Sequence, residues 1–187
     1  MPSVAIVPAA GKGERFGGAK LVARIHGEAL IDLTLRALLD GGVGRVIVVM
    51  APGVSLSEAR LIGDRRVQTV VNDDPSRGMF SSIQAGLAAA DGDPVVILPA
   101  DMPFVQLRTV AAVVDLCVRQ GVIVVPIHDG RRGHPIAFPA ALRDAVLGAL
   151  PESTLKTALA STHVERFELR VDDPGVLRDV DTPADLN

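Results

Sequence analysis

The chain has 187 residues, a length typical of about one domain, and 19 Lys and Arg against 22 Asp and Glu give it a net charge of −3. This mildly acidic balance, with 3% aromatic residues and neither Trp nor Tyr, excludes a general nucleic-acid-binding surface and the stacking platforms of single-strand binders. Cys117 is the only cysteine, which excludes an internal disulfide and a cysteine zinc cluster, and no apolar run approaches the length of a membrane span, so we expect a cytoplasmic protein without a membrane partner.

Short apolar runs alternate with longer amphipathic stretches in the first two thirds of the chain. The runs are rich in Val and Ile and predict strands buried on both faces of a parallel sheet, at residues 4–7, 46–50, 67–71, 95–98 and 122–126. Helical spacing of apolar residues predicts helices at 30–39, 57–65, 81–90 and 105–120. This order predicts an α/β protein with three α/β/α layers around a Rossmann-like, mainly parallel sheet.

The pattern changes after residue 126. A turn-rich stretch at 128–133 leads to an apolar run at 134–138, and the spacing then predicts helices at 140–149 and 154–160 and a strand at 164–171. No repeat, linker or low-complexity tract divides the sequence. We therefore expect a single domain over residues 1–187.

The first predicted strand leads directly into a loop rich in glycine. In open α/β sheets, ligands bind at the carboxyl ends of strands, and glycines let backbone amides curl around an anion. The loop matches neither the dinucleotide-binding fingerprint, because Phe16 stands where the third glycine is needed, nor the P-loop. We expect it to bind the polyphosphate of a nucleotide through Pro8, Ala9, Ala10, Gly11, Lys12, Gly13, Arg15 and Lys20, with a flexible connection as the alternative.

Carboxylates follow the fourth predicted strand and recur near the end of the chain. Asp101 comes directly after that strand, at the sheet edge where the glycine-rich loop lies, and would bind Mg²⁺ beside phosphates. Its alternative role is a turn or a helix cap. Asp179 and Asp181 would point to one side of an extended segment and could join Asp101 on a metal, with a solvated acidic tail as the alternative.

Two further segments carry polar residues suited to a nucleotide or to a second substrate. After the third predicted strand, Asn72, Gly78, Ser81 and Ser82 are candidates for contact with a base or ribose, although either serine would serve equally as a helix cap. Farther along the chain, Arg132 and His134 are candidates for holding an anionic second substrate, with a structural or surface histidine as the alternative.

Taken in order, these segments resemble the molybdenum-cofactor nucleotidyltransferases, within the larger glycosyltransferase-A-like nucleotidyltransferase group. Two departures from the family pattern are Phe16, where Met is usual, and Ala100, where Gly often precedes the Asp. Ala10 makes the sequence similar to the cytidylyltransferase branch, whose members tend to carry Ala-Ala-Gly. The matching segments are Ala9-Ala10-Gly11, Arg15-Phe16-Gly17, Lys20, Asn72, Gly78, Ser81-Ser82, Gly86-Leu87, Asp101-Met102-Pro103, Gly133-His134-Pro135 and Asp179-Val180-Asp181-Thr182-Pro183.

The resemblance implies transfer of CMP from CTP to the terminal phosphate of the molybdopterin cofactor, with release of pyrophosphate. It implies that Arg15, Lys20 and Asp101 are catalytic, with Mg²⁺ on Asp101, and that the product passes to a molybdoenzyme or its chaperone. The implied contacts with the second substrate are His134, Arg132, Asp179 and Asp181. GMP transfer from GTP, NMP transfer to another small phosphorylated acceptor, and a catalytically silent nucleotide-binding regulator remain open alternatives, whereas the broken fingerprint disfavours a nicotinamide-dependent oxidoreductase.

Overall fold

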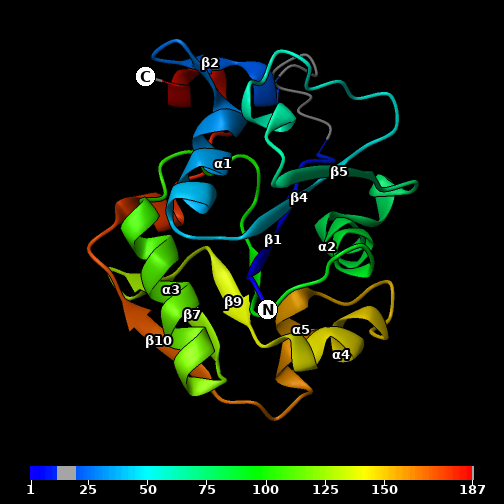
Figure 1. Ribbon diagram of the computed structural model, residues 1–187, viewed down its shortest axis with the longest axis vertical. Coiled ribbons are helices and arrows are strands. Elements are labelled where there is room, and N and C mark those ends of the chain that lie inside the picture. The colour runs from blue at the N-terminus through cyan, green and yellow to red at the C-terminus, as the bar shows by residue number, and fades with distance from the viewer. Residues whose placement is uncertain (12–19, 187) are drawn as a thin grey trace.

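The computed structural model describes residues 1–11 and 20–186. Among these residues, the centre of the molecule is an eight-stranded sheet in the order β10-β7-β9-β6-β1-β4-β5, with β8 paired to β7 (Figure 1). A separate hairpin joins β2 to β3. The strands are β1 (Val4–Pro8), β2 (Arg24–Ile25), β3 (Glu28–Ala29), β4 (Arg45–Met50), β5 (Val67–Val71), β6 (Val95–Ile97), β7 (Ile123–His128), β8 (Arg131–Arg132), β9 (Ile136–Phe138) and β10 (Arg166–Arg170).

Most strand pairs in the sheet are parallel, which confirms the predicted architecture. β1 pairs in parallel with β4 and with β6, β4 with β5, and β7 with β10. The exceptions are β9, which runs antiparallel between β6 and β7 and is not part of the predicted parallel set, and β8, which pairs antiparallel with β7. Because β1, β4, β5 and β6 run in one direction, their carboxyl ends meet at a single edge of the sheet.

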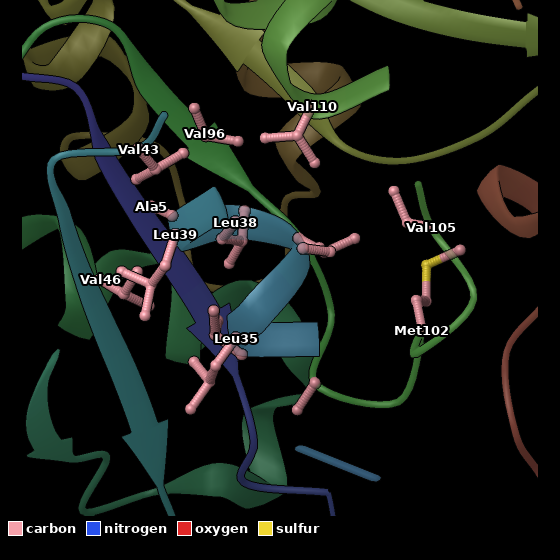
Figure 2. Close-up of a cluster of buried hydrophobic side chains, with 14 of the residues drawn as sticks. Ala5, Leu35, Leu38, Leu39, Val43, Val46, Val96, Met102, Val105 and Val110 are labelled. Carbon is pink, nitrogen blue, oxygen red and sulfur yellow. The ribbon is translucent and has the colours of Figure 1, made fainter. Parts of the chain in front are cut away.

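Helices cover both faces of the sheet. α1 (Leu30–Asp40) and α3 (Leu107–Gln120) pack on one face, and α2 (Met79–Ala88), α4 (Arg143–Leu147) and α5 (Leu155–Ala160) pack on the other (Figure 1). Successive residues of β1 alternate between the two cores because side chains of a strand point to opposite faces. Figure 2 shows Leu35 and Leu38 of α1 in one cluster with Ala5 of β1 and Val96 of β6. No helix in the described ranges is long and apolar enough to span a membrane.

The helix predicted at 57–65 is wrong. The structure has only a short 3-10 turn there, η3 (Leu61–Gly63). Asp32, on the first turn of α1, is buried, and its two carboxylate oxygens accept hydrogen bonds from the backbone N of Arg60 (2.9 Å) and of Leu61 (2.8 Å). The carboxylate of a distant helix thus binds two amides at the start of η3, and Leu56 and Ala59 reach the core although the segment is not an α-helix.

The single cysteine is a core residue, and its chemistry gives a testable consequence. Burial, helped by the negative charge of Asp93, raises the pKa of the Cys117 thiol to about 12. The reactive thiolate is therefore scarce at pH 8. We expect iodoacetamide to label Cys117 at least about 100-fold more slowly in the native protein than in urea, followed by mass spectrometry. Equal rates in the two conditions would show that the α3 face opens readily in solution.

Candidate active site

The loop that follows β1 starts between the ends of two neighbouring strands. Ala9 N donates a hydrogen bond to Val49 O (2.8 Å), and Ala100 N donates one to Pro8 O (3.1 Å). Ala9 and Ala10 are buried, and Gly11 is exposed at the sheet edge. Lys12, Gly13 and Arg15 lie outside the described residues, so their roles stay predictions. The described chain resumes at Lys20, in the short 3-10 turn η2 (Lys20–Val22).

Lys20 joins two carboxylates that come from distant parts of the chain. Its Nζ lies 2.8 Å from Asp101 Oδ2 and 3.5 Å from Asp181 Oδ1. The Lys20 side chain is 14% exposed, that of Asp101 is 29% exposed and that of Asp181 is 57% exposed, so the cluster is open to solvent on the Asp181 side. The structure therefore brings together three residues that the sequence predicted at one site.

The C-terminal segment reaches this cluster as an extended strand-like stretch. Val180 N donates to the backbone O of Asp101 (2.9 Å), and the Val180 side chain is fully buried against Ile25 and Leu30. Figure 1 shows this segment, in red, beside the β2 hairpin and α1. Because Val180 points inward, its neighbours Asp179 and Asp181 point outward, as an extended segment requires.

Asp185 holds the turn that carries Asp181, and it is absent from the predicted site. Its Oδ2 accepts hydrogen bonds from the backbone N of Asp181 (3.1 Å) and from both N (2.7 Å) and Oγ1 (2.8 Å) of Thr182. The hydrogen bonds from Thr182 are the main cause that lowers the pKa of Asp185. The Thr-x-x-Asp spacing, which resembles a capping box, was a sequence signal for this contact.

His134 lies beside the carboxylates but is held neutral near pH 7. Its backbone N donates to Val176 O (2.9 Å), and its side chain is half-buried. Burial lowers the pKa of His134, and the negative charges of Asp101 and Asp179 only partly oppose this effect. A neutral imidazole can hydrogen-bond an acceptor molecule but adds no positive charge to the site.

Arg132 is engaged elsewhere. Its Nε donates to Glu168 Oε1 (2.6 Å), and its guanidinium forms an exposed ion pair with the same carboxylate on the edge strand β10. The structure thus places Arg132 in a cross-strand pair and does not join it to the cluster of Lys20 and Asp101. Its predicted contact with a second substrate would require this pair to open.

The polar residues after β5 form a closed network. Asn72 Nδ2 donates to the Oγ atoms of Ser81 (2.8 Å) and Ser82 (3.0 Å), and its Oδ1 accepts from the N of Asp74 (3.1 Å). Asn72 and both serines are buried, and Ser81 Oγ donates to Gly78 O (2.8 Å). The network fixes the end of β5 to the first turn of α2 and presents Gly78, which is exposed with a φ of 85°. A nucleotide contact by these residues stays a prediction.

Asp173 is a buried carboxylate that the sequence analysis missed. Its Oδ2 accepts from the N of Gln106 (2.9 Å) and from Oγ1 of Thr109 (2.6 Å), and its Oδ1 accepts from the N of Gly175 (2.9 Å). The Asp173-Pro174 pair indicated a turn, but nothing local in the sequence indicated a partner 64 residues away at the start of α3.

The carboxylates near Lys20 fit a divalent cation that completes its coordination with substrate. No group of three or more His, Cys, Asp or Glu side chains gathers into a metal site within residues 1–11 and 20–186. Asp101 and Asp181 nevertheless flank one cation, the Lys20 ammonium, with hard oxygen ligands. Mg²⁺ is usually bound in proteins by one or two carboxylates together with water and phosphate oxygens. This pair therefore fits such an ion beside a phosphate-binding loop.

Comparison with known proteins gives a consistent set of matches. Residues 5–167 match the family model described as the MobA-like NTP transferase domain. The chain is 23% identical over 182 residues to the molybdenum cofactor cytidylyltransferase of Escherichia coli strain K12, covering 97% of this chain and 92% of that protein. It is 32% identical over 150 residues to the nicotine blue oxidoreductase of Paenarthrobacter nicotinovorans, covering 75% of this chain and 72% of that protein.

Solved structures share the fold. The crystal structure of Rv0371c from Mycobacterium tuberculosis H37Rv superposes with a TM-score of 0.82 at 23% identity, covering 99% of this chain and 95% of that chain. The complex of Rv0371c with manganese superposes with a TM-score of 0.77 at 21% identity, covering 99% of this chain and 96% of that chain. The three-layer arrangement around a mainly parallel sheet is thus common to these proteins.

Proposed function

Because this chain belongs to the MobA-like NTP transferase domain family and is a nucleotidyltransferase, we propose that it transfers CMP from CTP to the terminal phosphate of a molybdopterin cofactor. The observation that carries the proposal is the Lys20 ammonium between Asp101 and Asp181, at the sheet edge where the loop after β1 begins. A relative that covers nearly the whole chain is a molybdenum cofactor cytidylyltransferase, which supports both the nucleotide and the acceptor.

The reaction needs no protein nucleophile. A terminal phosphate oxygen of the acceptor forms a bond to the α-phosphorus of CTP, and the bond from that phosphorus to the oxygen bridging to the β-phosphorus breaks, so pyrophosphate leaves with the electron pair. The attacking group is already an anion and requires no general base. The protein's task is to align two anions and to reduce their repulsion.

Each residue of the cluster has a role in that task. Lys20, oriented by its two carboxylate partners, stabilises the charge that grows on pyrophosphate. Asp101 and Asp181 would hold Mg²⁺, which when bound supplies Lewis-acid stabilisation of the phosphates. The manganese complex of Rv0371c supports a divalent cation in a protein of this fold. Neutral His134 would donate or accept a hydrogen bond at the acceptor, beside Asp179.

The preference for CTP rests on Ala10 and on the cytidylyltransferase relative. Ala10 is buried directly after β1, where the guanylyl members of the family tend to have Gly. A methyl group at this position reduces the space at the carboxyl end of β1. GMP transfer from GTP, or NMP transfer to a different phosphorylated acceptor, would use the same Lys20 and Asp101. The product would pass to a molybdoenzyme or to its chaperone.

Thermal unfolding with Mg²⁺ and each of CTP, GTP, ATP, UTP and NAD tests the nucleotide. We expect CTP at 100 times its Kd to stabilise the protein by about 2.7 kcal/mol, which corresponds to a rise of roughly 5 to 10 °C in Tm. Lys20→Ala should abolish this rise, because it removes the ammonium that binds the triphosphate. Lys156→Ala, an exposed lysine on α5, is the matched control and should keep it.

The panel separates the alternatives. A rise in Tm with GTP alone would indicate guanylyl transfer instead of cytidylyl transfer. A rise in Tm with NAD alone would indicate redox chemistry, of the kind in the name of the Paenarthrobacter relative. No rise with any triphosphate would contradict the proposed nucleotide site. When CTP binds, pyrophosphate release on addition of molybdopterin cofactor then tests the acceptor, and release with another phosphorylated acceptor only would contradict that part of the proposal.

A further inference from the structure

Asp173 stands at the junction of the two segments that carry the carboxylates of the site. We propose that Asp173 is a positioning residue that sets the spacing of Asp101 and Asp181, and through that spacing the affinity for a divalent cation. The proposal rests on the proposed function, because it assumes that these two carboxylates form the metal site. Asp173 itself is 1% exposed and would touch neither the metal nor a substrate.

The first observation is that the two oxygens of the Asp173 carboxylate accept hydrogen bonds from two different segments of the chain. One oxygen accepts from the segment after Asp101, at Gln106 N (2.9 Å) and Thr109 Oγ1 (2.6 Å). The other oxygen accepts from the segment that leads to Asp181, at Gly175 N (2.9 Å). One side chain therefore links the start of α3 to η6 (Pro174–Leu177), with hydrogen bonds to a charged group, which are stronger than neutral ones.

The second observation is the close packing of η6 between two loops. A Cβ on Gly175 would lie 2.0 Å from the backbone O of Phe104, and a Cβ on Gly133 would lie 2.1 Å from the backbone O of Val176. Real Cβ atoms are not found at such distances. The backbone of η6 thus touches the loop after Asp101 on one side and the loop before His134 on the other, so a shift of η6 must move a backbone that it contacts.

The third observation is that further contacts along the same path join the two segments. The guanidinium of Arg178 lies over the ring of Phe104, with its Cζ 3.9 Å from the ring centroid. Two residues later, Val180 N donates to the backbone O of Asp101 (2.9 Å). The stretch from Asp173 to Asp181 is therefore attached to the stretch from Asp101 to Gln106 at both ends and in the middle.

The metal ligands themselves do not fix their own spacing. The side chains of Asp101 and Asp181 are 29% and 57% exposed, and the ammonium of Lys20 lies between them. Asp181 is exposed and Asp101 is partly exposed, and a solvent-accessible ion pair of this kind contributes little to fixing the separation of the two carboxylates. We therefore assign their separation to the contacts between the two segments, which include the hydrogen bond from Val180 N to Asp101 O and the buried carboxylate of Asp173.

The test measures binding of Mn²⁺ alone, by the EPR signal of the free ion, at a temperature well below unfolding. For Asp173→Asn we expect the Kd for Mn²⁺ to rise about tenfold, the lower end of the effect of altering groups behind metal ligands. An amide offers only one oxygen, so either the α3 side or Gly175 loses its acceptor. Thr109→Val, which removes a single hydrogen bond and keeps the shape, should raise the Kd about threefold and serves if Asp173→Asn fails to fold.

Asp32→Asn is the matched control, because Asp32 is also a buried carboxylate that accepts two backbone hydrogen bonds, at Arg60 and Leu61. Asp32→Asn should lower the Tm about as much as Asp173→Asn does, and it should leave the Kd for Mn²⁺ within about twofold of wild type. Equal Kd values for Asp173→Asn or Thr109→Val and wild type would overturn the positioning role. Asp101→Asn separates the two proposals: if it does not weaken Mn²⁺ binding, the metal site itself is wrong, and the positioning role falls with it.

Discussion

Asp101→Asn is expected to lower the rate of pyrophosphate release by about 10² to 10³-fold with little change in Tm. The substitution removes the nearer of the two carboxylates around the Lys20 ammonium, at 2.8 Å, and a ligand for the divalent cation. The fold should persist because the side chain is partly exposed and because the structural contact of this residue is made by its backbone O, which accepts from Val180 N. Initial rates with CTP and the acceptor, together with thermal unfolding, measure both effects.

Asp115→Asn is the control for this result. Asp115 lies on the solvent side of α3, where its Oδ2 pairs with Arg119 at 2.6 Å and its side chain is 59% exposed. Exposed pairs of this kind contribute about 0 to 1 kcal/mol, so the rate and the Tm should both stay close to wild type. A rate for Asp101→Asn within twofold of wild type would remove Asp101 from the reaction.

Gly133→Ala is expected to lower the free energy of unfolding by about 3 kcal/mol, at the upper end of the usual cost of overpacking. The new Cβ would lie 2.1 Å from the backbone O of Val176, and a backbone atom cannot turn away as the end of a side chain can. The backbone N of His134 also donates to that oxygen, so relief of the clash would break this hydrogen bond. At roughly 2 to 4 °C per kcal/mol, the Tm should fall by about 6 to 12 °C.

Gly63→Ala is the control that tests whether the loss of stability in Gly133→Ala comes from the clash with Val176 O. Gly63 has no neighbouring atom within 4 Å of the position of a Cβ, so Ala should fit there. A substitution of this kind changes stability by less than about 1 kcal/mol, and often favourably, because it restricts the unfolded chain. Equal decreases in Tm for Gly133→Ala and Gly63→Ala would show that the backbone around Gly133 can shift to make room for a Cβ atom.

The elements nearest the site were the most predictable from the sequence. The Val-rich run at 4–7 and the apolar run before Asp101 are local patterns, and they correctly predicted neighbouring parallel strands whose carboxyl ends share one edge. The role of the glycines after the first run stays a prediction. The helix predicted at 57–65 failed for the opposite reason. In the structure, two of its backbone amides donate to the carboxylate of Asp32, about 28 residues earlier in the chain, and the local spacing of apolar residues carries no information about such a distant partner.

In the candidate site, too, features encoded by local sequence motifs were predictable and features set by long-range contacts were not. Lys20, Asp101 and Asp181 could be proposed as one cluster because each follows or ends a recognisable motif, and the structure brings them together. The pairing of Arg132 with Glu168 on β10 could not be predicted, because it depends on which strands become neighbours in the sheet. The hydrogen bonds that Asn72 donates to two buried serines likewise depend on how α2 packs beside β5.

By itself, the sequence determined the class of fold and the order of most helices and strands, and it predicted the edge of the sheet at which the candidate site lies. These properties follow from the periodicity and the termini of single elements, and each is encoded by neighbouring residues. Only the tertiary structure decided that β9 enters the sheet antiparallel, that a 3-10 turn bound to Asp32 stands where a helix was predicted, and that Asp173 links the two segments of the candidate site. Those outcomes are set by contacts between residues far apart in the chain, whose free energies appear only when the whole core has packed.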